Sequence, residues 1–162
     1  MAIPVTRERI DYGSPDGSVL HGAAREVVDG AGTATTLTVA QSGALCLFNT
    51  AAGQAYTLPA ISARDVGTTF DFVATVTGTG TYSVTTDAAT TFIGGGLDSS
   101  STAVAEGGDT FVADPTATVA FTGDSDLTGR LVGTHFSVTA YSTTTWTIGG
   151  TMMGVGTLAT PF

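Results

Sequence analysis

The chain has 162 residues, of which 22 are glycine and 12% are charged, and its formal net charge at pH 7 is −9. A domain of this length can bury a core of its own. With 14 acidic residues against five arginines and no lysine, the surface is unsuited to phosphate backbones and anionic membranes, so we expect neither nucleic-acid binding nor membrane association. Thirty-two threonines favour pleated strands and the glycines disfavour long helices, which together predict an all-β protein.

The segment 1–34 differs in composition from the rest of the chain. It contains three of the five arginines and the turn-forming stretches SPDGS and DGAG, and it shows no sustained period of 2 or 3.6. We predict an extended N-terminal arm that orders on a partner, with a disordered leader as the alternative. Its aliphatic residues could add a strand to an exposed sheet edge, and its arginines could pair with carboxylates. The partner-binding residues expected here are Ile3, Val5, Arg7, Arg9, Ile10 and Arg25.

From residue 35 to residue 151 the hydrophobic pattern has a period of 2. Eleven short segments carry it: TTLTV, ALCLF, AYTLP, TTFDFVATV, TYSVTT, TTFIG, DTFVA, ATVAFT, GRLVG, HFSVTAY and TTTWTI. Short strands at this spacing predict an antiparallel β-sandwich or jelly-roll-like domain. We expect hairpins at GTG (78–80) and YST (141–143), and a surface loop at 94–109. No repeat of fixed length is present, which disfavours a solenoid or a propeller.

Two of these segments assign particular residues to the core. Alternation in 68–76 places Phe70, Phe72, Ala74 and Val76 on one face, and Trp146 lies on a similar apolar face near the end of the chain. The corner before the first of these strands needs a reversal at Gly67, where glycine costs little.

None of the residues with reactive side chains forms a recognisable catalytic or metal-binding pattern. Ser125 lies in GDSD, which is typical of GDS-type esterases, but no Asp-x-x-His follows it, so we interpret it as a turn serine. The single cysteine, Cys46, is surrounded by apolar residues and is predicted to be buried and inert. Two histidines are too few for a zinc site. We therefore expect a protein that is not an enzyme and has no catalytic residue, cofactor or metal ion.

The last eleven residues, 152–162, form an apolar, glycine-jointed tail. Such a tail is too apolar to be a free end, so we expect it to lie against protein. A neighbouring subunit is favoured over the tail's own domain, because TTTWTI already resembles a last strand. The oligomer contacts expected here are Met152, Met153, Val155, Leu158 and Phe162.

Two segments carry a resemblance to a known group of proteins. The segment SGALCLFNTAAGQAYTLPAISARDVGTTFDFVATV (42–76) and the later VGTHFSVTAYSTTTWTIGG (132–150) resemble recurring segments of tailed-bacteriophage virion proteins, over about residues 35–162. Such segments occur in head-decoration (cement) proteins and in head or tail fibres. The arm has no counterpart in this resemblance.

The resemblance implies a structural function. We expect a capsid decoration protein, made in the host cytoplasm, that binds the major capsid protein on the exterior of the virion and cements neighbouring capsomers. The alternative is a head- or tail-fibre domain that recognises a host surface glycan, and a low copy number in the particle would favour it. High apolar content with few charges also predicts a homo-oligomer, with a trimer favoured by the resemblance.

Overall fold

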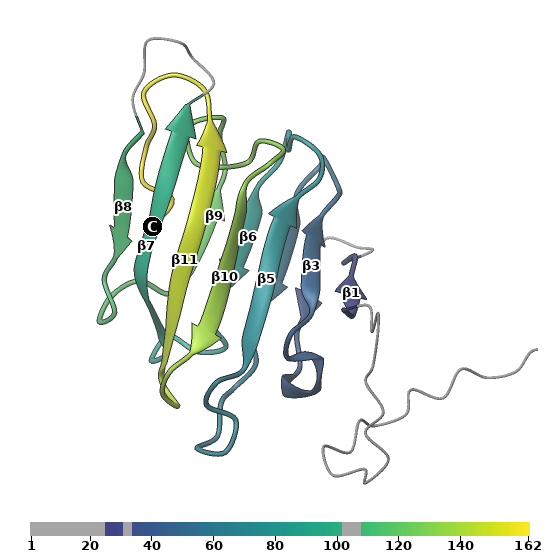
Figure 1. Cartoon of the computed structure of the whole chain (residues 1–162), viewed down its shortest axis with the longest axis vertical. Helices are drawn as coiled ribbons and strands as arrows, with labels where there is room; N and C mark the ends of the chain where they lie inside the picture. Colours follow the sequence, from purple (N-terminus) through teal and green to yellow (C-terminus); the bar gives the residue numbers. More distant parts are fainter. Residues whose placement is uncertain (1–24, 31–33, 102–107) are drawn as a thin grey trace, which may run out of the picture.

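The protein is a two-layered β-sandwich, which confirms the all-β prediction. The structure is a computed structural model that describes residues 25–30, 34–101 and 108–162. A seven-stranded sheet forms one layer and a four-stranded sheet forms the other (Figure 1). Among these residues, no helix has the length and apolar character needed to cross a membrane.

The larger sheet has the strand order β1-β3-β5-β10-β11-β7-β8, and the smaller sheet has the order β2-β4-β6-β9. A short 3-10 helix, η1, precedes β3. In chain order the elements are β1 (Val27–Val28), β2 (Ala34–Thr36), η1 (Val39–Gln41), β3 (Leu45–Phe48), β4 (Gln54–Thr57), β5 (Thr69–Ala74), β6 (Tyr82–Thr85), β7 (Phe92–Ser101), β8 (Thr110–Ala113), β9 (Ala120–Gly123), β10 (His135–Ala140) and β11 (Thr145–Gly154).

The first six strands alternate between the two sheets, so neighbours within each sheet run parallel. β1, β3 and β5 are parallel in the larger sheet, as are β2, β4 and β6 in the smaller one. Within the described residues five of the nine strand pairings are parallel. The expected antiparallel, jelly-roll-like arrangement is therefore wrong in strand direction, because each connection crosses to the other layer instead of turning back. The hairpin predicted at GTG is wrong for the same reason, since β5 and β6 lie in different sheets.

This N-terminal half winds as a coil, although no fixed repeat is present in the sequence. The register pairs Val28 with Cys46 and Cys46 with Phe72, so successive turns of the coil have unequal lengths. Because the connections between these strands differ in length, the coil gives no constant period in the sequence.

The C-terminal half completes both sheets. β10 and β11 form the hairpin expected at YST, closed by a hydrogen bond of 3.1 Å from the amide of Tyr141 to the carbonyl of Thr145. β7 lies parallel to β11 over ten residue pairs. It occupies residues 92–101, so the surface loop expected at 94–109 is wrong for this part, and residues 102–107 lie outside the described residues. The segment GRLVG, expected as a strand, is a turn.

The inner faces of the two sheets form one aromatic core. Phe70, Phe72 and Ala74 of β5 are buried as predicted, and Trp146 of β11 is fully buried. Rings from both sheets meet there. The closest pair across the layers joins Phe121 of β9 and Phe136 of β10, with ring centroids 4.5 Å apart. Gly67 has a φ of 98° at the corner before β5, which confirms the predicted need for glycine there.

Candidate binding surface

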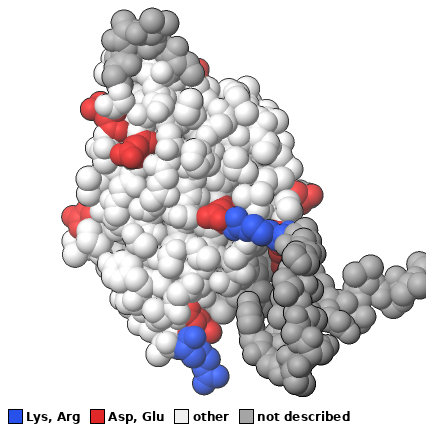
Figure 2. All heavy atoms as spheres, viewed as in Figure 1, with Lys and Arg blue, Asp and Glu red and all other residues white. Residues whose placement is uncertain are grey.

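The outer face of the seven-stranded sheet is the broadest exposed sheet face of the molecule, and it carries little charge. Figure 2 shows most acidic and basic side chains near the rim of this face and one adjacent acidic and basic pair within it. Strand registers place one residue from each of six strands in a row across it. From β3 to β8 the row consists of Leu45, Asp71, Ser137, Gly149, Gly96 and Val112.

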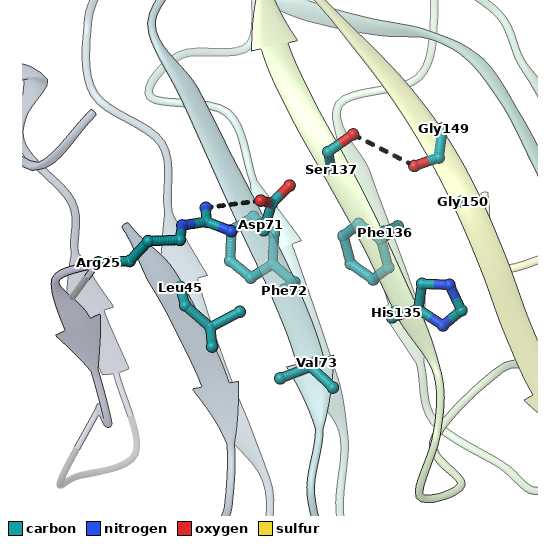
Figure 3. Close-up of a pocket in the computed structure, with 10 residues that line it drawn as sticks. All are labelled: Arg25, Leu45, Asp71, Phe72, Val73, His135, Phe136, Ser137, Gly149 and Gly150. Carbon is teal, nitrogen blue, oxygen red and sulfur yellow. Dashed lines mark hydrogen bonds and ion pairs between the residues drawn. The ribbon is translucent and has the colours of Figure 1, made fainter. Parts of the chain in front are cut away.

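Two glycines in the middle of this row leave the backbone of the sheet uncovered. A Cβ placed on Gly149 would meet no atom within 4 Å. A shallow depression of about 370 Å³, lined in part by Gly149, lies between β3 and β11 (Figure 3). Phe72 and Phe136 also line it, but their rings are buried on the core side, whereas the half-buried side chains of Leu45 and Val73 contribute to its lining. The residues lining the depression are Arg25, Leu45, Asp71, Phe72, Val73, His135, Phe136, Ser137, Gly149 and Gly150.

One ion pair borders the depression. Arg25 Nη2 lies 2.6 Å from Asp71 Oδ2, and Arg25 also donates hydrogen bonds from Nε to the carbonyl of Gly43 (2.8 Å) and from Nη2 to that of Ala44 (3.3 Å). Both charged side chains are partly exposed, so the pair contributes at most about 1 kcal/mol to stability. Its main effect is positional, because it fixes the chain to the sheet where the arm reaches the domain.

The polar groups in the depression do not form a nucleophile and a base. The Ser137 hydroxyl donates a long hydrogen bond of 3.5 Å to the carbonyl of Gly149 (Figure 3). His135 Nδ1 lies 3.0 Å from the carbonyl of Gly133. Asp71 is paired with Arg25. A Ser-His-Asp mechanism needs these three side chains hydrogen-bonded in sequence. The geometry of the depression therefore supplies no activated nucleophile.

Ser125 and Cys46, the two candidate nucleophiles in the sequence, lie in a turn and in the core, respectively. Ser125 lies in a turn, where its Oγ is 3.1 Å from Thr128 Oγ1, as its interpretation as a turn serine requires. Cys46 is fully buried, and this burial, with a smaller contribution from Asp71, raises its pKa from 9.0 to about 12. Its thiol stays protonated and unreactive near neutral pH. In the described part of the chain, no three His, Cys, Asp or Glu side chains are grouped as metal ligands would be.

A buried polar cluster holds the end of the arm segment against the sandwich. Gln54 Nε2 donates to the carbonyls of Asp29 (2.9 Å) and Gly30 (3.1 Å) and to the hydroxyl of Tyr56 (3.0 Å). That hydroxyl donates to the carbonyl of Leu47 at 2.7 Å. A Cβ on Gly30 would collide with the Gln54 amide and the Tyr56 hydroxyl, so glycine is required for this close approach. Sequence analysis missed this cluster.

The structure describes only one of the predicted arm contacts. Arg25 pairs with Asp71 of its own domain, and its predicted contact with a partner stays a prediction. β1 and β2 show that part of the segment expected as an arm belongs to the two sheets. The other predicted contacts lie outside the described residues: Ile3, Val5, Arg7, Arg9 and Ile10.

The C-terminal tail lies against its own domain. β11 continues to Gly154, so Met152 is in a strand, where it is fully buried, and Leu158 is 8% exposed. The carbonyl of Pro161 accepts a 2.8 Å hydrogen bond from the amide of Thr122 in β9, and Phe162 packs on the core. Met152 and Leu158 thus have almost no surface left for a neighbouring subunit, whereas Val155 is exposed and Met153 is half-buried. Whether the exposed part of the tail contacts another subunit stays a prediction.

Comparison with known proteins assigns the chain to no group: no protein-family model, no curated protein and no solved structure matches it. The resemblance of residues 35–162 to phage virion proteins therefore stays a prediction.

Proposed function

We propose that the protein is a structural component of a tailed-phage virion, a decoration protein that binds the outside of the capsid and stabilises contacts between capsomers. The observation that carries this proposal is the outer face of the seven-stranded sheet. It is broad and poor in charge, and its middle row holds Gly149 and Gly96. Cores of protein–protein interfaces are depleted in charged residues. A face of this kind suits contact with another protein surface better than contact with a small substrate.

Binding to an assembled shell needs little affinity from each copy. Many copies that bind only the closed lattice stabilise it by mass action. The net charge of −9 would keep free copies apart before assembly. The arm, with Ile3, Val5, Arg7, Arg9 and Ile10, would supply a second contact to the major capsid protein or to a neighbouring oligomer.

Substituting Gly149 tests the role of the face. Gly149→Arg places a long charged side chain where a Cβ meets open space, so the fold should persist while docking is blocked. Thr57→Arg is the matched control, since Thr57 lies half-buried in β4 of the other sheet. We expect Gly149→Arg to lower occupancy on undecorated particles at least tenfold and Thr57→Arg to leave it unchanged. Equal occupancy for both folded variants would contradict docking through this face.

A receptor-binding function is the second candidate, and the depression is the observation that favours it. Asp71, His135 and Ser137 present hydrogen-bonding groups around the depression, as a sugar hydroxyl would require. Glycan binding by the purified chain, lost in Ser137→Ala together with Asp71→Asn, would support it. A copy number of hundreds in the particle would favour decoration, and one of tens or fewer would favour a fibre.

A further inference from the structure

The outermost strand β8 is an unpaired sheet edge. β8 is the last strand of the larger sheet, and its register with β7 pairs Thr110 with Asp98 and Val112 with Gly96. The amide of Ser99 donates to the carbonyl of Asp109 at 2.7 Å, which makes this a hydrogen-bonded pair of the ladder. Because such pairs alternate in an antiparallel ladder, the backbone groups of Thr110 and Val112 point away from β7. No other strand of the described residues pairs with them.

This edge is both apolar and acidic. Val112 is 73% exposed, more than any other large hydrophobic side chain of the described residues. Asp109 precedes the strand, Asp114 follows it, and Asp98 lies beside Thr110, whose hydroxyl donates to it at 2.8 Å. In Figure 2 acidic groups without basic neighbours lie along this side of the molecule. Two β8 edges brought together would place these carboxylates against each other, so self-pairing of β8 is disfavoured.

The opposite charge lies at the N-terminus of the same chain. Residues 5–10 read VTRERI, and in an extended strand Val5, Arg7 and Arg9 lie on one face. Next to β8, the two arginines can lie beside Asp98 and the acidic ends of the strand, while the backbone supplies the missing ladder.

We propose that residues 3–10 of one copy add a strand to the β8 edge of a second copy. The arm joins its own domain at β1, which is the opposite edge of the larger sheet. Each copy therefore offers a donor at one edge and an acceptor at the other, an arrangement that closes into a ring such as a trimer. Residues 11–24 can extend on the order of 45 Å, which exceeds the width of roughly 30 Å that the seven strands of the larger sheet span. This inference rests on the partner-binding role given to the arm in the proposed function.

Two variants separate donor from acceptor. Val112→Pro removes an N–H that points away from β7, so the fold should tolerate it while strand addition is blocked. A chain lacking residues 2–10 keeps the edge but has no donor strand. Val112→Ala is the matched control, because it keeps the backbone donor.

The test is a complementation experiment on purified full-length chain and these variants, read by native mass spectrometry and analytical ultracentrifugation. We expect oligomers for the native chain and Val112→Ala, and monomers for Val112→Pro and the truncated chain. An equimolar mixture of the two monomeric variants should give a heterodimer, since one supplies the arm and the other the edge. Raising NaCl from 0.05 to 0.5 M should weaken that heterodimer about fivefold or more.

Three results would overturn the proposal: a monomeric native chain, unchanged oligomers in Val112→Pro, or no heterodimer in the mixture. If the arm bound the β8 edge of its own domain, the native chain would be monomeric or the mixture would give no heterodimer. The complementation experiment does not measure occupancy on particles, so its failure would not contradict the decoration function. In the same way, failure of the occupancy test with Gly149→Arg would not contradict strand addition at β8.

Discussion

At the scale of single residues, buried polar groups fix where the arm segment meets the sandwich. Tyr56 is fully buried, yet its hydroxyl both accepts from Gln54 and donates to the carbonyl of Leu47. Leaving such groups without partners costs more than the hydrogen bonds themselves gain. The cluster is therefore a specific requirement of this fold, and the position of β1 depends on it.

Removing one hydroxyl tests this requirement. Tyr56→Phe should lower the free energy of unfolding by about 1–3 kcal/mol, because Leu47 and Gln54 each lose a buried partner. Tyr141→Phe is the control, since Tyr141 is 54% exposed, and it should change stability by less than about 0.5 kcal/mol. Urea denaturation of both variants measures the difference. Equal stabilities would mean that the cluster does not hold the arm segment.

Burial also predicts a dependence of stability on alkaline pH. The pKa of Cys46 is raised from 9.0 to about 12, and burial raises the pKa values of Tyr56 and Tyr82 above 10.0. The unfolded chain then releases protons from these groups before the folded chain does, so their contribution to stability is constant below about pH 9 and falls above it. The slope should reach about 1.4 kcal/mol per pH unit for each group.

Cys46→Ala separates the thiol from the tyrosines. In this variant the decline should begin near pH 10, where only the tyrosines titrate, although the absolute stability is lower because a buried group is lost. Denaturation midpoints at half-unit steps from pH 7 to pH 11 provide the comparison. An onset at the same pH in both proteins would show that Cys46 does not contribute.

At the scale of elements, β11 and the tail act as one unit. β11 continues through residues expected to be a separate tail, and the chain then turns back to β9. The amides of Val155 and Ala159 donate to the carbonyls of Asp126 and Leu127, both at 2.9 Å. The tail thus covers an edge of the smaller sheet and protects it from pairing with other chains.

Deleting residues 155–162 should therefore weaken the fold. The deletion removes buried Leu158, the packing of Phe162 and the hydrogen bond from Thr122 to Pro161, which should cost about 2–5 kcal/mol. Val155→Ser, at an exposed position, should cost less than about 0.5 kcal/mol. Thermal unfolding by circular dichroism measures both. A deletion that leaves the unfolding temperature unchanged but dissociates an oligomer would restore the role that the sequence alone favoured.

Local pattern predicted individual strands well, but it could not predict how they pair. Alternation placed Phe70 and Phe72 in the core because half-buried strands have a strict period of 2. The parallel winding of β1, β3 and β5 depends on connections that cross between the layers. Because these connections differ in length, the sequence shows no period that would reveal the crossing. The strand expected at TTFIG covers only the start of β7, and the rest of β7 was taken for a loop because its glycines favour loops locally. Its pairing with β11 comes from residues about fifty positions away.

The candidate surface was predictable only in part. Arg25 was identified from its charge, but its partner Asp71 and the neighbouring Ser137 become adjacent only through the register of β5 and β10. The depression is lined in part by Gly149, and a glycine in the sequence does not reveal what surrounds it. Gly149 followed by Gly150 in a strand was the one available signal.

At the scale of the whole molecule, charge and shape divide the surface into different roles. The broad face is poor in charge, β8 is bordered by Asp98, Asp109 and Asp114, and the arm provides three of the five arginines. A chain with a net charge of −9 and three of its five arginines within residues 1–34 can stay dispersed in solution and still associate through that segment. These features together support a protein that assembles with other proteins on a large surface.

A cryo-EM map of the virion that contains this chain tests the central claim most directly. The account predicts density for the sandwich at many equivalent positions on the outside of the head, with the outer face of the seven-stranded sheet, including Gly149 and Ser137, turned toward the major capsid protein. Density for the chain only at the tail or in fibres, or on the head with this face turned toward solvent, would contradict it.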